Sequence, residues 1–199
     1  MGSLSTVFEI SDDAKKEILE KVNSKNVLSS VSQIQSQNDG SLEIIKEDFE
    51  EQAHEFIKDK ISEFGWEKMQ DLVAAIVRAL GFKTKVSPSG PDRGKDIIAS
   101  PDGLGLNDPR ILIEVKHRQG SMGSQEIRSF LGAFRAGNKG IYVSTGGFSK
   151  DAKYEAERAD HPITLLDIDD LVDLIITHYD NFDIDGRALI PLKKIYWPI

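Results

Sequence analysis

Apolar side chains recur at helical spacing in the stretch GWEKMQDLVAAIVRALGF, residues 65–82. Met69, Val73 and Ile76 fall on one face of a helix with 3.6 residues per turn, and this pattern predicts a helix packed on a core. Gly81 follows the last periodic positions, and glycine is the residue that most often ends a helix. The pattern therefore predicts a buried helix ending near Gly81.

Short apolar runs separated by turn-forming residues follow this helix and predict strands. Three such strands follow one another, and from residue 124 onward helical segments alternate with further strands. The first of these helices has Ser124 as its cap and Gly137 at its end, and the second is capped by Ser149. The resulting order of elements predicts an α/β fold, a mixed β-sheet flanked by helices on both faces. The strands are expected at 82–86, 97–100, 111–117, 140–145 and 162–167, and the helices at 124–137, 148–160 and 167–179.

The N-terminal part has a different composition. Residues 23–41 are rich in Ser, Asn and Gln and indicate a linker or loosely ordered arm, whereas residues 12–22 favour a short helix. Residues 41–64 combine spaced apolar side chains with many charges, which predicts an amphipathic helix packed on the main domain. We therefore expect three parts: an N-terminal arm with helix and linker (1–60), the main domain (61–178) and an extended C-terminal tail (179–199).

Composition narrows the kinds of chemistry available. The chain of 199 residues has no cysteine, which excludes disulfides, thiolate zinc sites and cysteine nucleophiles. It has no apolar run of about 18 residues and no secretory signal pattern, so we expect a cytoplasmic protein with no membrane span.

Charge is unevenly distributed along the chain. The net charge is −8, yet residues 61–150 contain 13 Lys and Arg against 9 Asp and Glu, and both flanking parts are acidic. Because salt screens charges beyond about 8 Å, a local basic surface can bind phosphates on an acidic protein. The basic middle of the chain is the expected phosphate-binding part.

The run ILIEVKHRQG, residues 111–120, places two charges within an apolar strand. Side chains alternate along a strand, so Glu114 and Lys116 share one face. Asp96 directly precedes the neighbouring strand, which predicts that its carboxylate meets Glu114 at one end of the sheet. Two close carboxylates repel each other unless a cation lies between them, and Mg²⁺ prefers oxygen ligands. The pattern predicts a metal site suited to hydrolysis of a nucleic-acid backbone.

Four segments occur in the order found in one nuclease family: SGPDRGKDIIAS, ILIEVKHRQGSMGSQEIRSFLGAF, GIYVSTGGFSKDAKYEAE and ITLLDIDDLVDLI. Over residues 64–177 the chain resembles the catalytic domain of Mrr-type restriction endonucleases, in the PD-(D/E)xK nuclease superfamily. The resemblance implies a restriction-endonuclease-like fold, magnesium dependence and DNA cleavage that leaves a 5′ phosphate.

The resemblance also implies roles for individual residues. Asp96 and Glu114 take the metal-binding acidic positions, Lys116 takes the lysine position, and Glu67 matches a helix glutamate that reaches the metal directly or through water. Gln125 is expected to contact a phosphate or water from the start of its helix. The remaining substrate-binding rim is basic, with Arg93, Lys95, Arg118 and Arg128 and, on the preceding strand, Lys83 and Lys85.

The sequence therefore predicts a magnesium-dependent DNA endonuclease, with Mn²⁺ able to substitute. We expect it to act in a restriction system, of which modification-dependent restriction is one type. Two alternatives stay open: a repair or recombination nuclease such as a junction resolvase, and a DNA-binding or assembly module without catalysis. Double-stranded DNA is the expected partner. A homodimer through residues 43–64 would allow both strands to be cut, and the DNA-reading module usual in the family is not evident in residues 1–60.

Overall fold

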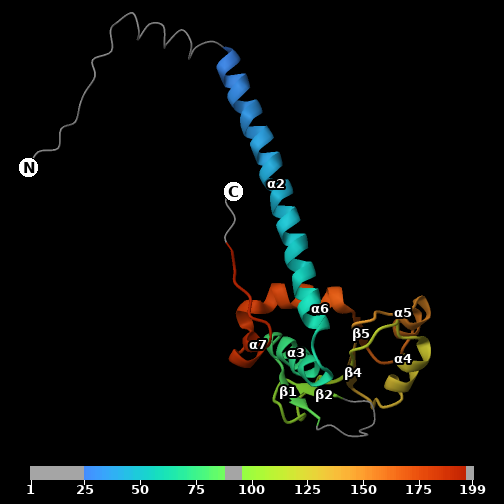
Figure 1. Cartoon of the computed structure of the whole chain (residues 1–199). Coiled ribbons are helices and arrows are strands. Elements are labelled where there is room, and N and C mark those ends of the chain that lie inside the picture. Colours follow the sequence, from blue (N-terminus) through green and yellow to red (C-terminus); the bar gives the residue numbers. More distant parts are fainter. Residues whose placement is uncertain (1–24, 88–95, 196–199) are drawn as a thin grey trace, which may run out of the picture. The chain divides into compact units, whose positions relative to one another are not determined.

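The computed structural model describes residues 25–87 and 96–195, with side chains from residue 42 onward. The chain divides into two compact units, Met1–Glu51 and Gln52–Ile199. The second unit contains the entire sheet and its flanking helices (Figure 1). It also includes residues 52–60 and the segment after residue 178, which the sequence analysis assigned to the arm and the tail.

A five-stranded mixed sheet forms the centre of this unit, as the sequence predicted. The strands lie in chain order, β1 to β5. β1, β2 and β3 pair antiparallel, and β3, β4 and β5 pair parallel. A helix connects each parallel strand to the next. The strands are β1 Lys83–Val86, β2 Ile97–Ser100, β3 Arg110–Lys116, β4 Asn138–Ser144 and β5 Ile163–Leu166.

Helices cover both faces of the sheet (Figure 1). On one face Ile113 and Val115 of β3 pack with helix α3 and with α6. On the other face Leu112 of β3 packs with α4 and α5. Successive residues of β3 therefore enter two different cores, which explains its nearly continuous burial. The helices are α3 Trp66–Ala79, α4 Ser124–Leu131, α5 Lys150–Glu157 and α6 Ile168–His178.

Helix α3 has the predicted apolar face. Met69, Leu72 and Val73 are almost completely buried, with 0 to 1% of their surface exposed. Its end is also as predicted, because Gly81 has a φ of 95° and its N–H donates to the carbonyl of Arg78 at 2.9 Å. Glycine is required there since other residues seldom adopt a positive φ.

Helix α4 is shorter than predicted. It starts after Gly123, whose N–H donates to the Glu126 carboxylate at 3.1 Å, so Ser124 is its first residue rather than its cap. It ends at Leu131, not near residue 137, because Phe134 leaves the helical path and packs edge-on against Phe130 at 4.9 Å.

The predicted cap of α5 is confirmed, with the Ser149 hydroxyl accepting the N–H of Ala152 at 3.1 Å.

Helix α2 spans Lys25–Ser62. It includes residues 25–40, for which the sequence predicted a linker. Backbone hydrogen bonds alone define a helix, and no proline occurs before residue 88 to interrupt them. The polar composition of this stretch therefore did not prevent a helical backbone.

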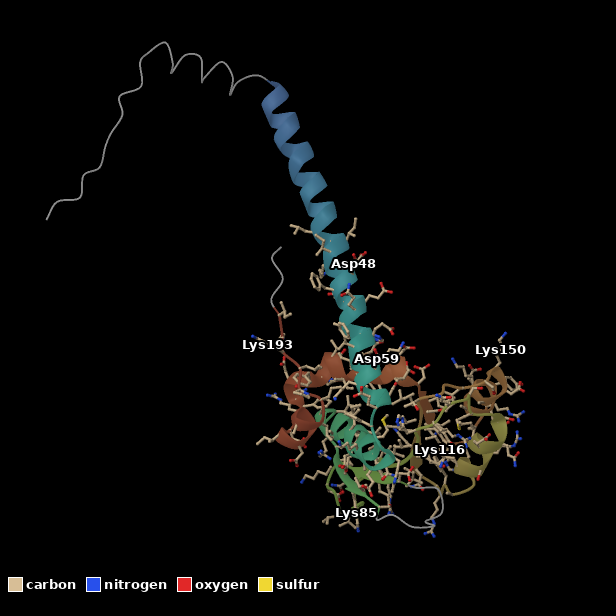
Figure 2. All side chains as sticks on the ribbon, in the orientation of Figure 1. Asp48, Asp59, Lys85, Lys116, Lys150 and Lys193 are labelled. Carbon is tan, nitrogen blue, oxygen red and sulfur yellow. The ribbon has the colours of Figure 1, made fainter. Side chains whose placement is uncertain are left out.

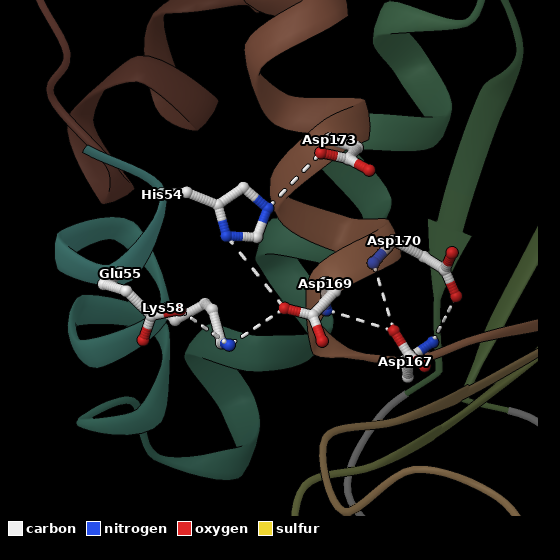
Figure 3. A network of polar contacts seen from close by, with 7 residues as sticks. All are labelled: His54, Glu55, Lys58, Asp167, Asp169, Asp170 and Asp173. Carbon is white, nitrogen blue, oxygen red and sulfur yellow. Dashed lines mark hydrogen bonds and ion pairs between the residues drawn. The ribbon is translucent and has the colours of Figure 1, made fainter. Parts of the chain in front are cut away.

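The last turns of α2 pack on the sheet domain as expected from their amphipathic pattern. Ile57 and Ile61 are buried in the core. On the exposed side, Lys58 Nζ lies 2.9 Å from Asp169, and His54 Nε2 lies 3.3 Å from Asp173, so two side chains of α2 reach the first turns of α6 (Figure 3). Apolar burial supplies the main attraction, because exposed ion pairs contribute at most about 1 kcal/mol each.

The C-terminal segment is not simply extended, in contrast to the prediction. Residues Tyr179–Asn181 form a 3₁₀ turn and Ile184–Leu189 form helix α7. Asp183 caps α7 by accepting the N–H of Gly186 at 2.8 Å, and the same carboxylate accepts Arg78 Nε at 2.6 Å. A short polar helix of this kind is fixed by its contact with α3, which a local pattern does not reveal.

The loop between β2 and β3 is organised around the carboxylate of Asp102. It accepts the hydroxyl of Ser100 at 2.9 Å and the N–H groups of residues 104–107 at 2.9 to 3.2 Å. Desolvation by itself would raise the pKa of Asp102, but these hydrogen bonds outweigh it and lower the pKa to about 2. The ionised carboxylate therefore holds the loop together.

Replacing Asp102 with Asn is expected to lower stability at neutral pH. Because the folded-state pKa lies below the unfolded value of about 3.9, the stabilisation is present above about pH 4 and is lost as pH falls toward 2. The difference in urea midpoint between the two proteins should therefore shrink over that range. Asp108→Asn in the same loop is the control; equal effects of both substitutions at neutral pH would contradict the role given to Asp102.

Candidate active site

Asp96 lies at the entrance of β2, directly before its first residue. Its N–H donates to the carbonyl of Ile113 at 2.9 Å, and its carboxylate Oδ2 accepts the N–H of Val115 at 2.7 Å. Ile97 pairs with Ile113, so the β2–β3 ladder ends one residue after Asp96, and the N–H of Val115 holds the Asp96 carboxylate against β3. Glu114 is the residue before Val115, and the negative charge of Asp96 raises the pKa of Glu114, so the two carboxyl groups lie close together.

Glu114 and Lys116 occupy the same face near the end of β3. The Glu114 side chain is only 10% exposed, and its Oε1 lies 2.7 Å from Lys116 Nζ. Burial raises the pKa of Glu114, Lys116 opposes this by hydrogen bond and charge, and the negative charge of Asp96 raises the pKa again. A buried carboxylate with a second carboxylate nearby is a site where an added cation lowers the electrostatic free energy.

Strand β4 places two further side chains beside Glu114 and Lys116, which the sequence alone did not reveal. Tyr142 pairs with Glu114 and Ser144 with Lys116, and they are 1% and 0% exposed. Burial, followed by the charge of Glu114, raises the pKa of Tyr142. Among buried side-chain atoms of the described residues, the Ser144 hydroxyl oxygen has no hydrogen-bond partner. The strand was recognisable in the sequence, but its register with β3 was not.

The donor set fits a hard divalent cation. Asp96 and Glu114 offer carboxylate oxygens close enough for the charge of Asp96 to raise the pKa of Glu114, and Mg²⁺ is commonly bound by one or two carboxylates with several waters. Within residues 25–87 and 96–195, no group of three or more acidic, His or Cys side chains is arranged to hold a metal. Asp96 and Glu114 are therefore the candidate metal ligands among the described residues.

Glu67 lies exposed in the first turn of α3. It does not form a three-residue metal-binding group with Asp96 and Glu114 among the described residues. The first-turn position also suits the helix dipole, and a contact of Glu67 with the metal through water stays a prediction.

The predicted substrate-binding residues have different environments. Arg118 contacts Met122 Sδ at 3.3 Å and lies 3.6 Å from Glu126, while Gln125 is exposed at the start of α4. Arg128 Nη1 lies 3.0 Å from the nearly buried carboxylate of Glu155, so it joins α4 to α5. Arg93 and Lys95 lie outside the described residues.

Two loops meet beside the end of β3. The N–H of Thr145 donates to the carbonyl of Lys116 at 3.1 Å, and the Thr145 hydroxyl lies 3.1 Å from His117 Nδ1. A Cβ on Gly146 would overlap the carbonyl oxygens of Gly120 and Arg118. The absence of a side chain at residue 146 therefore allows the loop after β4 to lie against the residues that follow Lys116.

Comparison with known proteins identifies the family of the chain. The Mrr_cat family model, described as restriction endonuclease, matches residues 61–175, more than half of the chain. The chain belongs to this restriction endonuclease family. The matched residues contain the sheet, Asp96, Glu114 and Lys116.

Individual relatives are more distant. The chain is 29% identical over 98 residues to the uncharacterized protein y4cE of Sinorhizobium fredii, covering 47% of this chain and 25% of that protein. The DNA modification-dependent restriction endonuclease AspBHI is 17% identical, with a TM-score of 0.53 over 68% of this chain and 38% of AspBHI. MspJI restriction endonuclease, solved in complex with a 27-mer oligonucleotide, is 19% identical with a TM-score of 0.47 over 76% of this chain and 35% of MspJI. The likeness to AspBHI supports the restriction-endonuclease-like fold.

The chain spans about a quarter of the curated relative and between 35 and 38% of these two solved structures. Among the helices of the described residues, none combines the length and apolar character required to cross a membrane.

Proposed function

We propose that this domain is a DNA endonuclease that hydrolyses phosphodiester bonds with Asp96, Glu114 and Lys116. The observation that carries the proposal is the position of the Asp96 carboxylate on the N–H of Val115, beside Glu114, with the Lys116 ammonium 2.7 Å from Glu114. Membership of the restriction endonuclease family supports the reaction class. Double-stranded DNA is the proposed substrate.

Asp96 and Glu114 would hold Mg²⁺, with Mn²⁺ able to substitute. A bound ion supplies Lewis-acid stabilisation of the phosphate and lowers the pKa of a coordinated water. Lys116 stays on the same face and stabilises negative charge that accumulates on the phosphate oxygens. The water oxygen bonds to phosphorus as the bond to the 3′ oxygen breaks, which leaves a 5′ phosphate and a 3′ hydroxyl.

We place this activity in a restriction system in which DNA modification directs cleavage. AspBHI, which shares the fold, is a DNA modification-dependent restriction endonuclease, and this likeness motivates the choice. The DNA-reading module would lie elsewhere, either in another chain or in further sequence. A homodimer would present two sites to the two strands, and the exposed Ile44 and Ile45 of α2 offer an apolar contact for it.

Purified chain is expected to cut plasmid DNA when Mg²⁺ or Mn²⁺ is present and to leave it intact in EDTA. Nicked and linear products are separated on agarose gels, and their ends are tested for a 5′ phosphate. Methylated, unmethylated and branched DNA are compared in parallel, because preference for a branched substrate would instead indicate a repair or recombination nuclease. Binding without cleavage in either metal would contradict the proposal and favour a silent DNA-binding module.

A further inference from the structure

A groove of about 420 Å³ lies on the sheet beside the candidate active site. Its walls come from β1, β2, the start of β3 and the loop organised by Asp102. The lining residues are Lys85, Ser87, Ile98, Ser100, Gly103, Leu104, Gly105 and Arg110. Its place on the sheet, its charge and its length indicate the kind of ligand that it binds.

The groove and the carboxylate pair share one face of the sheet. Lys85 pairs with Ile98, and Ile98 pairs with Leu112, two residues before Glu114 on β3. The N–H of Ser87, which lines the groove, donates to the backbone carbonyl of Asp96 at 2.8 Å, so the groove adjoins the residue that carries the first carboxylate. Paired residues and residues two apart on a strand point to the same side, so these side chains form one continuous surface.

The lining of the groove is basic. Lys85 and Arg110 are exposed, and neither makes an ion pair with any residue in the described ranges. Among the described residues no acidic side chain lines the groove, and Asp102 directs its carboxylate to the N–H groups of its own loop. Arg110 extends beside Gly105, where an added Cβ would lie 3.6 Å from Nε. Two exposed cations with no acidic partner in the described ranges attract an anionic ligand.

The groove is long enough for several nucleotides. Along the strands, Lys85 lies two residues and Arg110 four residues from the level of Asp96 and Glu114. At about 3.4 Å per residue these positions are about 7 and 14 Å from the carboxylates. One strand of B-DNA advances about 3.4 Å per nucleotide, so 14 Å corresponds to about four nucleotides.

We propose that this groove binds the phosphodiester backbone of the DNA strand on one side of the cleaved bond, through Lys85 and Arg110. The inference rests on the proposed endonuclease function and adds a defined backbone subsite to it. Contacts of this kind carry no base information, so they increase affinity for all sequences alike. They position the strand so that the phosphate about four nucleotides away meets Asp96 and Glu114.

The test compares two double variants with the same change in charge. Lys85→Gln with Arg110→Gln removes the groove cations, and Lys150→Gln with Lys153→Gln removes two exposed lysines of α5. In Figure 2, Lys85 lies at the lower edge of the domain and Lys150 at its upper right. Binding of a fluorescent 20-base-pair duplex is measured by anisotropy in EDTA over a range of salt concentrations. Urea midpoints of both variants verify that they are folded.

Each phosphate contact contributes about 0.9 to the slope of log K against log salt. The groove variant is therefore expected to bind on the order of tenfold more weakly, with a slope reduced by about 1.8, and the α5 variant to match the unsubstituted chain. Equal slopes for the two variants, or no duplex binding by the unsubstituted chain, would overturn the proposal that the groove binds the DNA backbone. Cleavage by the unsubstituted chain in Mg²⁺ or Mn²⁺ is scored separately, so failure of the endonuclease function is distinguishable from failure of the groove.

Discussion

Replacing Lys116 with Ala is expected to slow magnesium-dependent DNA cleavage by about 10²- to 10³-fold. The ammonium is the one described cation that pairs with Glu114, at 2.7 Å, and it is on the face that carries the carboxylates. Its removal takes away a positive charge from the position where phosphate charge accumulates. Rates are measured from the loss of supercoiled plasmid at saturating Mg²⁺, with Lys150→Ala as the control for a lost exposed lysine.

The variant must also be shown to fold, because Lys116 offsets the burial of Glu114. Without the lysine the pKa of Glu114 is expected to rise further, since the ion pair lowers it in the intact protein. Lys116→Ala combined with Glu114→Gln removes both charges and restores electrical balance, so its urea midpoint should exceed that of Lys116→Ala alone. Cleavage by Lys116→Ala at the rate of Lys150→Ala would contradict the catalytic role.

Much of the fold follows from local patterns. Alternation within a single strand was enough to place Glu114 and Lys116 together, and the position of Asp96 directly before β2 brings its carboxylate to the N–H of Val115, next to Glu114. Helix α3, which ends just before Gly81, could be predicted equally well, because its apolar spacing and the glycine that follows it lie within one segment. Such features depend on residues close together in the chain.

The errors have a common physical cause, which is dependence on contacts between distant segments. Helix α4 ends early because Phe134 packs over Gly140, and α7 forms against α3. The contribution of Tyr142 required the register of parallel strands, which local sequence does not encode.

Replacing Gly146 with Ala is expected to reduce both stability and cleavage. The new methyl group would overlap the backbone oxygens of Gly120 and Arg118, which cannot rotate away as a side chain can, so the loops must separate. Overpacking of this kind costs about 1 to 3 kcal/mol. Gly132→Ala is the control, because its Cβ would meet its nearest neighbour at 3.4 Å, a normal contact distance. Urea midpoints that are equal for the two variants would contradict the steric argument.

The loss of cleavage in Gly146→Ala should act through Lys116. Thr145, next to Gly146, donates its N–H to the carbonyl of Lys116 at 3.1 Å, so separation of the loops displaces the end of β3. Adding Gly146→Ala to Lys116→Ala should then lower the remaining cleavage much less than it does in the unsubstituted chain. Fully multiplicative losses would show instead that the loop acts independently of the lysine, for example by changing contacts with DNA.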